Sequence, residues 1–271
     1  MTQRDWTAPS TRTLVDYRLE GGVAVLTFTD PPANTYSYAM MRQLDDAVLR
    51  ARFDPSVHVI VLTGAGEKFF CAGANIEMLR EVDPTFKYFF CLHANETLLR
   101  LEQTPKLVIA AINGHCVGGG LEIALAADLR IAKENAGKVG LPEVALGVLP
   151  GTGGTQRLAR LIGKSRALEI MVEGKTMSVA EAQGAGLINK TLAAQNFLDE
   201  VLAYARQFVP PSKASLAVGR IKRGVQSGLD VGLAEGLALE RELQQFLFES
   251  DDAREGLAAY LEKRAPQFAG K

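Results

Sequence analysis

The sequence predicts a layered α/β fold, in which strands and helices alternate along one chain of 271 residues. Two observations carry this prediction. Short apolar runs rich in β-branched residues predict buried strands at residues 23–29, 58–63, 107–112 and 129–132. The stretches between these runs repeat apolar residues at helical spacing and are bounded by glycine or proline. The length fits one large domain, or a domain of about 200 residues with a C-terminal extension.

The N-terminal part begins with a polar segment and then sets up the alternation. Residues 1–13 predict a loose arm, with Trp6 packed on the surface of the body. The run at 23–29 predicts the first strand, because turn residues lie on both sides of it. Residues 37–52 predict an amphipathic helix, and residues 57–64 predict a second strand of nearly continuous apolar character.

The C-terminal part is predicted to be helical. Ser178 and Glu181 have the spacing of a capping box, which predicts a short helix after Ser178. Pro210 and Pro211 end a helix expected at about 195–208. Three more helices are expected, at residues 213–226, 231–248 and 251–262. We therefore divide the chain into a core at residues 1–212 and a C-terminal helical region at residues 213–271.

Composition excludes several classes of protein. The 30 basic and 31 acidic residues nearly cancel, so a broad electrostatic surface for nucleic acid is not expected. The three cysteines have neither disulfide-framework nor metal-ligand spacing, so we expect a reducing compartment and no metal. No apolar run reaches 18 residues and the N-terminus lacks an apolar signal core, which predicts a cytoplasmic protein without a membrane partner.

The stretch from residue 110 to residue 154 holds the candidate chemistry. Glycines 118, 119 and 120 lie between an apolar strand and a helix, so their backbone N–H groups can approach an oxygen that carries negative charge. Two isolated glutamates follow, Glu122 and Glu143. Either glutamate alone would more often be an exposed surface charge. Together in apolar, glycine-rich segments, where an idle carboxylate is costly to desolvate, they indicate acid–base chemistry.

A second loop has the same character. Residues 71–74 are all small, and they stand between an apolar segment and a helix that is expected to begin near Ile76. Small side chains again leave backbone N–H groups accessible.

These stretches resemble the enoyl-CoA hydratases of the crotonase family. The resemblance rests on FFCAGANI at 69–76, on INGHCVGGGLEIALAADLRIA at 112–132, and on residues 139–190, which begin VGLPEVALGVLPGTGG. At lower density it extends from about Val23 to the C-terminus. It implies a spiral of repeated β-β-α units, followed by helices that cover the site and build trimers or hexamers.

The resemblance also implies roles for individual residues. Glu143 is the principal acid/base, Glu122 orients the attacking water, and the backbone N–H groups of Ala74 and Gly119 form an oxyanion hole. Double-bond isomerases of the family keep only the equivalent of Glu143, so the pair favours hydration of a 2-enoyl-CoA. No cofactor is expected, because coenzyme A is part of the acyl-CoA substrate, and fatty-acid β-oxidation is the implied setting. The implied substrate-binding residues are Ala72, Gly73, Asn75, Ile76, Gly118, Gly151, Phe86 and Phe90.

Several interpretations stay open. The family usually has aspartate where this chain has Asn75, which affects local capping and hydrogen bonds. Aromatic residues in the helix expected at 84–103 fit either core packing or a wall of the acyl pocket. His93 and His115 are interpreted as satisfied local hydrogen bonders. The basic residues of the C-terminal region fit a solvated face better than contacts to coenzyme A phosphates: Lys222, Arg223, Lys263 and Arg264.

Two further functions remain as alternatives to hydration of a straight-chain 2-enoyl-CoA. One is another acyl-CoA reaction of the same family: isomerisation, decarboxylation, or hydration of a branched or cyclic enoyl-CoA. The other is RNA binding, which some relatives perform and which the near-neutral charge and the glutamate pair disfavour.

Overall fold

A six-stranded sheet forms the centre of the molecule. The structure, a computed structural model, describes residues 5–271. The strand order is β1-β2-β3-β5-β7-β10, with β1 antiparallel to β2 and the other neighbours parallel. The strands are β1 (Val15–Glu20), β2 (Val23–Phe28), β3 (Val59–Gly64), β5 (Leu107–Ile112), β7 (Leu129–Lys133) and β10 (Lys190–Leu192). All four strands predicted from apolar runs are confirmed.

A second, smaller sheet lies beside the first and holds four short strands. Its order is β4-β6-β8-β9, with β4, β6 and β8 parallel and β9 antiparallel to β8. The strands are β4 (Phe69–Cys71), β6 (His115–Val117), β8 (Lys138–Gly140) and β9 (Thr176–Ser178). Three residues are too few for a periodic pattern, which explains why sequence analysis did not predict these strands.

The two sheets are built by one repeated unit. A strand of the large sheet is followed by a strand of the small sheet and then by a helical turn, three times in succession. The units are β3-β4-α2, β5-β6-α4 and β7-β8-η1, which end in α2 (Ile76–Glu81), α4 (Gly119–Leu125) and the 3-10 turn η1 (Glu143–Leu146). The β-β-α spiral implied by the family resemblance is therefore confirmed.

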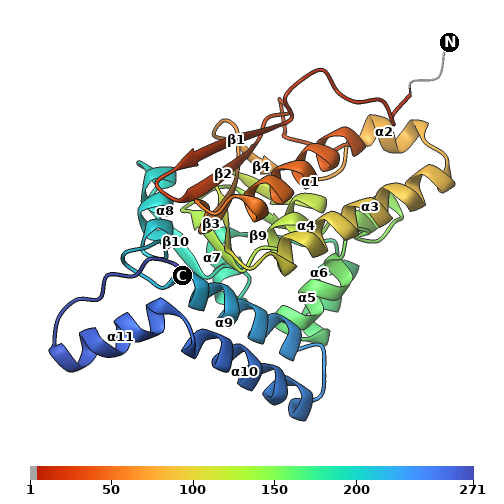
Figure 1. The fold of residues 1–271 in the computed structure, drawn as a ribbon. Helices are drawn as coiled ribbons and strands as arrows, with labels where there is room; N and C mark the ends of the chain where they lie inside the picture. Colours follow the sequence, from red (N-terminus) through yellow and green to blue (C-terminus); the bar gives the residue numbers. More distant parts are fainter. Residues whose placement is uncertain (1–4) are drawn as a thin grey trace.

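Helices cover both faces of the large sheet (Figure 1). Alternate residues of each strand point to opposite faces, so β2 directs Ala24 and Leu26 to one core and Val23 and Val25 to the other. The first core is closed by α1 (Tyr38–Phe53) and α3 (Pro84–Gln103), and the second by α8 (Phe197–Arg206). These three helices agree with the predicted ranges.

Short helices connect the spiral to the tail. They are α5 (Gly154–Ile162), α6 (Lys164–Val172) and α7 (Val179–Gly184). At the start of α7 the Ser178 hydroxyl accepts from the Glu181 N–H, and the Glu181 carboxylate accepts from the Ser178 N–H. The predicted capping box is confirmed.

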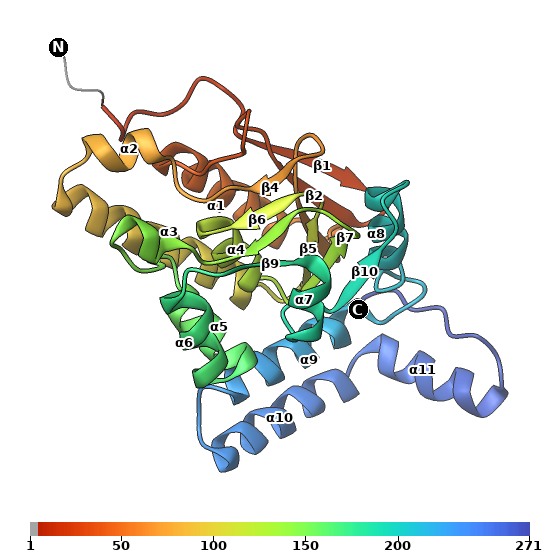
Figure 2. The same cartoon turned by 180° about the vertical axis from the view of Figure 1, so that it is seen from behind.

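The C-terminal helices α9 (Ser215–Gly228), α10 (Leu233–Phe248) and α11 (Asp251–Glu262) differ in how they meet the body. Helix α9 packs against α3 and β5, whereas α10 has no buried residue and lies along α9 on the side away from the sheets (Figure 2). Lys222 on α9 is buried, forms an ion pair with Asp128 at 2.9 Å, and donates to the backbone oxygens of Leu101 and Lys106. It is a structural anchor, so its interpretation as part of a solvated basic face was wrong.

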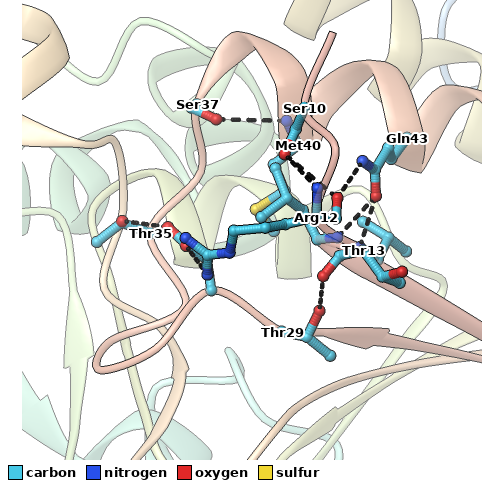
Figure 3. Close-up of polar contacts among 11 residues, drawn as sticks. Ser10, Arg12, Thr13, Thr29, Thr35, Ser37, Met40 and Gln43 are labelled. Atoms are coloured by element: carbon cyan, nitrogen blue, oxygen red, sulfur yellow. Dashed lines mark hydrogen bonds and ion pairs between the residues drawn. The ribbon is translucent and has the colours of Figure 1, made fainter.

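Polar contacts connect the end of the N-terminal segment to the body of the protein (Figure 3). The Gln43 side chain accepts from the N–H groups of Leu14 and Val15 and donates to the backbone oxygen of Arg12. The Arg12 guanidinium also lies 3.0 Å from Asp30. The loose arm expected at 1–13 is therefore wrong for Arg12 and for the residues beside it, and residues 1–4 lie outside the described part.

Two further outcomes concern the same end of the chain. Trp6 packs on the core, as predicted, and its Nε1 donates to Glu81. Strand β1 was missed because VDYRLE alternates charged and apolar residues on a half-exposed edge strand, so no continuous apolar run marks it. Within residues 5–271, no helix is long and apolar enough to cross a membrane.

Candidate active site

Three equivalent loops meet at one edge of the small sheet. Strands β4, β6 and β8 run parallel, so the residues that follow them emerge on the same side. These residues are the loop at 72–75, the glycine run at 118–120, and Glu143 at the start of η1. The repeated unit thus brings together segments that lie far apart in sequence.

The loop after β4 lies directly against the glycine run. A Cβ added to Gly73 would lie 3.1 Å from the backbone nitrogen of Gly119. The backbone of Tyr36 forms a parallel bridge with Ala74. The Tyr36 N–H donates to the backbone oxygen of Gly73, and the Tyr36 backbone oxygen accepts from the N–H of Asn75. In such a bridge the N–H of the central residue, Ala74, points away from its partner. Within the described chain, neither the N–H of Ala74 nor that of Gly119 donates a hydrogen bond.

Two of the glycines are required by their neighbours. Gly118 has φ 55°, and a Cβ there would lie 3.1 Å from Oε1 of Glu143. A Cβ on Gly119 would lie 2.0 Å from a ring carbon of Tyr36, far inside contact distance. The glycine run therefore lets the Tyr36 ring and the Glu143 carboxyl group approach the backbone on which α4 begins.

Glu122 is buried in the first turn of α4, with 1% of its surface exposed. Its Oε1 accepts from the N–H groups of Thr152 and Gly154, both at 2.7 Å, and its Oε2 accepts from the Thr152 hydroxyl at 2.5 Å. Gly154 begins α5, so the carboxyl group occupies a helix N-terminus that favours negative charge. Burial raises the pKa of Glu122, and the three hydrogen bonds act to lower it.

Glu143 has a different environment. Its Oε2 is buried and has no hydrogen-bond partner among the described residues. Burial raises the pKa of Glu143 to about 7, and the nearby charge of Glu122 adds to this effect. Its own backbone N–H and the Lys87 ammonium act in the opposite direction. At neutral pH this carboxyl group can both hold and release a proton.

The two glutamates therefore lie in contrasting environments. One carboxylate is held by three donors, and the other belongs to a half-buried glutamate whose pKa is raised to about 7. Environments that act differently on the pKa values of two neighbouring carboxyl groups are typical of acid and base partners in catalysis. The β-β-α spiral and this pair define the protein as an acid–base enzyme.

Comparison with known proteins identifies the family. The sequence pattern of the enoyl-CoA hydratase/isomerase family matches residues 18–271, and the chain belongs to this family. It is 37% identical to a short-chain-enoyl-CoA hydratase of Clostridium acetobutylicum, over 90% of this chain and 93% of that protein. It is 36% identical to a crotonyl-CoA hydratase of Syntrophomonas wolfei, over 93% and 96%. A crystal structure of an enoyl-CoA hydratase from Geobacillus kaustophilus superposes with a TM-score of 0.94 at 43% identity, covering 97% and 98%.

The remaining predicted binding residues lie around this centre at different depths. Ala72 and Asn75 are half-buried, Ile76 is exposed, and the Asn75 side chain caps α2 by accepting from the Met78 N–H at 2.9 Å. Asn75 therefore caps this helix although the family usually has aspartate at this position. Gly151 precedes Thr152, and its backbone oxygen accepts from the Asn95 side chain at 3.5 Å.

The two predicted aromatic residues of α3 do not play equal parts. Phe86 is half-buried, whereas Phe90 is 1% exposed and stacks on Tyr36 with ring centres 5.5 Å apart. Phe90 belongs to the core beneath the site, and its contact with an acyl chain stays a prediction. Phe89, the third aromatic residue considered, is exposed.

Three residues close to the glutamates were not found from the sequence. Thr152 and Tyr36 are hydrogen-bonded or packed in the site, and Lys87 influences both carboxyl groups through its charge. Thr152 stands inside a glycine loop that otherwise signals only a turn. Tyr36 precedes the N-cap of α1, which is the one sequence signal at its position.

The histidines have separate outcomes. The interpretation of His115 as a local hydrogen bonder is confirmed, because its Nδ1 accepts from the Lys138 N–H at 3.1 Å. His93 was interpreted wrongly: its Nε2 is buried without a hydrogen-bond partner among the described residues, and its ring packs edge-on against Tyr38. Across residues 5–271, no group of three or more His, Cys, Asp or Glu side chains is arranged to hold a metal ion.

Proposed function

We propose that this protein is an enoyl-CoA hydratase, which adds water across the double bond of a 2-enoyl-CoA thioester. The observation that carries the proposal is the contrast between Glu122, held by three donors, and Glu143, which has an unpartnered oxygen and a pKa of about 7. Hydration needs one group that accepts a proton from water and another that gives a proton to carbon. Relatives named crotonyl-CoA hydratase, short-chain-enoyl-CoA hydratase and 2,3-dehydroadipyl-CoA hydratase support the same reaction.

In the proposed reaction, Glu122 begins as the carboxylate and Glu143 as the acid. Glu122 binds the water and takes one of its protons while the water oxygen forms a bond to the β carbon. The electrons of the double bond move onto the thioester oxygen, which accepts hydrogen bonds from the N–H groups of Ala74 and Gly119. The α carbon then takes the proton of Glu143, and the thioester carbonyl forms again.

The proposal extends to the surroundings of the site. We expect residues 72–76, Gly118, Gly151 and Phe86 to border the bound thioester, with coenzyme A as part of the substrate and no separate cofactor. The exposed apolar side chains of α10 and α11 support an oligomer, and the family resemblance favours a homotrimer or a pair of trimers. A cytoplasmic location also stays a proposal, consistent with three free thiols.

A direct assay separates hydration from the other reactions of the family. The purified protein is given crotonyl-CoA and, separately, a 3-enoyl-CoA, while loss of the conjugated thioester and formation of 3-hydroxyacyl-CoA are followed. We expect hydration of crotonyl-CoA. Isomerisation of the 3-enoyl-CoA without any hydration of crotonyl-CoA would contradict the proposal.

A further inference from the structure

A chain of two hydroxyl groups leads from the core to the Glu122 carboxylate. The Tyr36 hydroxyl lies 2.7 Å from the Thr152 hydroxyl, which lies 2.5 Å from Oε2 of Glu122. Tyr36 is 3% exposed, Thr152 is 2% exposed and Glu122 is 1% exposed. Water therefore has little access to these groups, and each of them depends on the next for its hydrogen bond.

The chain has one direction when Glu122 is ionised. A carboxylate only accepts hydrogen bonds, so the single proton of the Thr152 hydroxyl is directed to Glu122. The Thr152 oxygen must then accept from Tyr36. Burial raises the pKa of Tyr36 well above its usual value, and the charge of Glu122 raises it further, so Tyr36 keeps the proton that it donates.

Other contacts hold both Tyr36 and Thr152 in place. The Tyr36 backbone is paired with Gly73 and Asn75, and its ring packs between Gly119 and Phe90. At the other end, the Arg157 guanidinium donates to the backbone oxygen of Thr152.

Arg157 is itself held in place. Its guanidinium forms a two-pronged ion pair with Glu102, at 2.8 Å and 2.6 Å. A rigid donor of this kind fixes the orientation of the group that it contacts.

We propose that Tyr36 and Thr152 are positioning residues that keep Glu122 ionised and hold its carboxylate in one orientation for the attacking water. This inference rests on the proposed hydratase function. Hydrogen bonds to the ionised form favour that form, so the chain counteracts the burial that would otherwise protonate Glu122. Packing alone would be served by phenylalanine at position 36 and valine at position 152, because both fill nearly the same volume without the hydroxyl.

The first test removes each hydroxyl while keeping the shape. We expect Thr152→Val to lower kcat about tenfold to a hundredfold with little change in KM, since a hydrogen bond to a charged group is lost. Its acid limb of kcat/KM should move upward by about one pH unit, because the pKa of Glu122 rises. Thr152→Ser keeps the hydroxyl and should restore both properties to within about threefold of the parent.

The second test asks whether Tyr36 acts through Thr152. Tyr36→Phe should lower kcat by roughly threefold to tenfold, as expected for a neutral hydrogen bond. Added to Thr152→Val, it should have no further effect, because the acceptor of its hydrogen bond is gone. An undiminished effect of Tyr36→Phe in the double variant would overturn the chain.

Two matched control variants come from the same molecule. The hydroxyls of Thr97 and Tyr17 are buried and have no hydrogen-bond partner among the described residues. Thr97→Val and Tyr17→Phe make the same chemical changes away from the site, and we expect parental pH profiles from both. If Thr152→Val matched Thr97→Val in kcat and in its acid limb, the inference would be wrong.

A readout without turnover separates this inference from the proposed function. The protein is labelled with 13C-glutamate and carries Glu143→Gln. The carboxyl signal that is absent when Glu122→Gln is also present belongs to Glu122, and its titration gives the pKa of Glu122. Thr152→Val should raise that pKa whether or not the parent hydrates crotonyl-CoA, and an unchanged pKa counts against the chain. An inactive parent would refute the hydratase proposal instead. If Thr152→Val does not fold, Tyr36→Phe provides the measurement, and an unchanged pKa of Glu122 in that variant likewise counts against the chain.

Discussion

Glu122 accepts three hydrogen bonds, whereas Oε2 of Glu143, its partner across the site, is buried with no donor in the described chain. Successive copies of the spiral unit place the two glutamates, yet one carboxylate sits at the N-terminus of α5 and the other lies against Gly118. The active form of the pair therefore carries a single proton, held mainly by Glu143 at neutral pH.

This arrangement predicts a bell-shaped pH profile for kcat/KM. Activity should fall as pH rises through about 7, where Glu143 loses its proton, and should fall at low pH as Glu122 becomes protonated. Hydration consumes no net proton and shares one transition state with dehydration. Both directions should therefore give the same profile when crotonyl-CoA and 3-hydroxybutyryl-CoA are compared.

Lys87 provides a variant that should move both limbs to higher pH, because its charge lowers the pKa of Glu122 as well as that of Glu143. Its positive charge lowers the pKa of Glu143, so Lys87→Met should shift the alkaline limb to higher pH. Lys164→Met removes an exposed lysine elsewhere and is the control. A shift of the alkaline limb to lower pH in Lys87→Met would show that another group sets this limb.

Glu143→Gln should lower turnover of crotonyl-CoA by about a hundredfold or more, the usual scale for loss of a general acid. Because Oε2 has no hydrogen-bond partner in residues 5–271, the substitution breaks no hydrogen bond to them at that oxygen, and we expect thermal stability and binding of the CoA ester to stay close to the parent. Kinetics, calorimetry and a binding titration provide the measurements. Glu200→Gln, on the exposed side of α8, is the control, and parental turnover in Glu143→Gln would remove Glu143 from the mechanism.

Glu122→Gln should also depress hydration, but its cost in stability should be larger. The amide can still accept from the N–H groups of Thr152 and Gly154, whereas the Thr152 hydroxyl loses its acceptor. An unsatisfied buried donor costs about 1–3 kcal/mol, which denaturant unfolding can measure. Exchange of the α protons of a saturated acyl-CoA should suffer less than hydration, and the reverse order would exchange the roles of the two glutamates.

Removal of metal ions should leave activity unchanged. In the proposed reaction, backbone N–H groups stabilise the negative charge on the thioester oxygen, and the described residues offer no cluster of metal ligands. Dialysis against a chelator followed by assay tests this directly. Activity that disappears and returns only with added zinc or magnesium would refute the prediction.

The purified protein should be an oligomer. Apolar side chains remain exposed on the tail of this single chain, and a cleft of about 1090 Å³ between α5, α9 and the end of α3 is also lined by apolar residues. The exposed side chains are Leu229, Val231, Leu233, Leu237, Phe246, Phe248, Leu257, Tyr260 and Leu261. Light scattering should give a mass well above one chain of 29.2 kDa. We expect removal of residues 213–271 to give an inactive, aggregating product, whereas an active monomer would contradict the assembly.

How much of this could be read from sequence depends on the distance between interacting residues. Helices α1 and α3 were predictable because their apolar periodicity and caps are local. Glu122 and Glu143 were found because recognisable motifs surround them. The hydrogen bond from Tyr36 to Thr152 joins residues 116 positions apart, and neither residue stands in a pattern that signals the other.

Short elements failed for another reason. Strands β4, β6 and β8 have three residues each, and their pairing is set by the long strands that precede them in the spiral. Similarly, no sequence pattern near Lys222 indicates that Asp128 is its partner, so a buried ion pair was interpreted as a solvated charge.

The Lys222–Asp128 pair also limits how this protein can be recombined with its relatives. A junction between the core and the tail assigns the two charges to different parents, although both are buried and only 2.9 Å apart. Losing one member of a buried pair costs about 3–5 kcal/mol, because the other charge stays without a partner. A chimera that takes α9 from one parent should therefore take residue 128 from the same parent. In a set of such chimeras, the stable members should keep residues 128 and 222 from one parent, although the junction between core and tail lies between them.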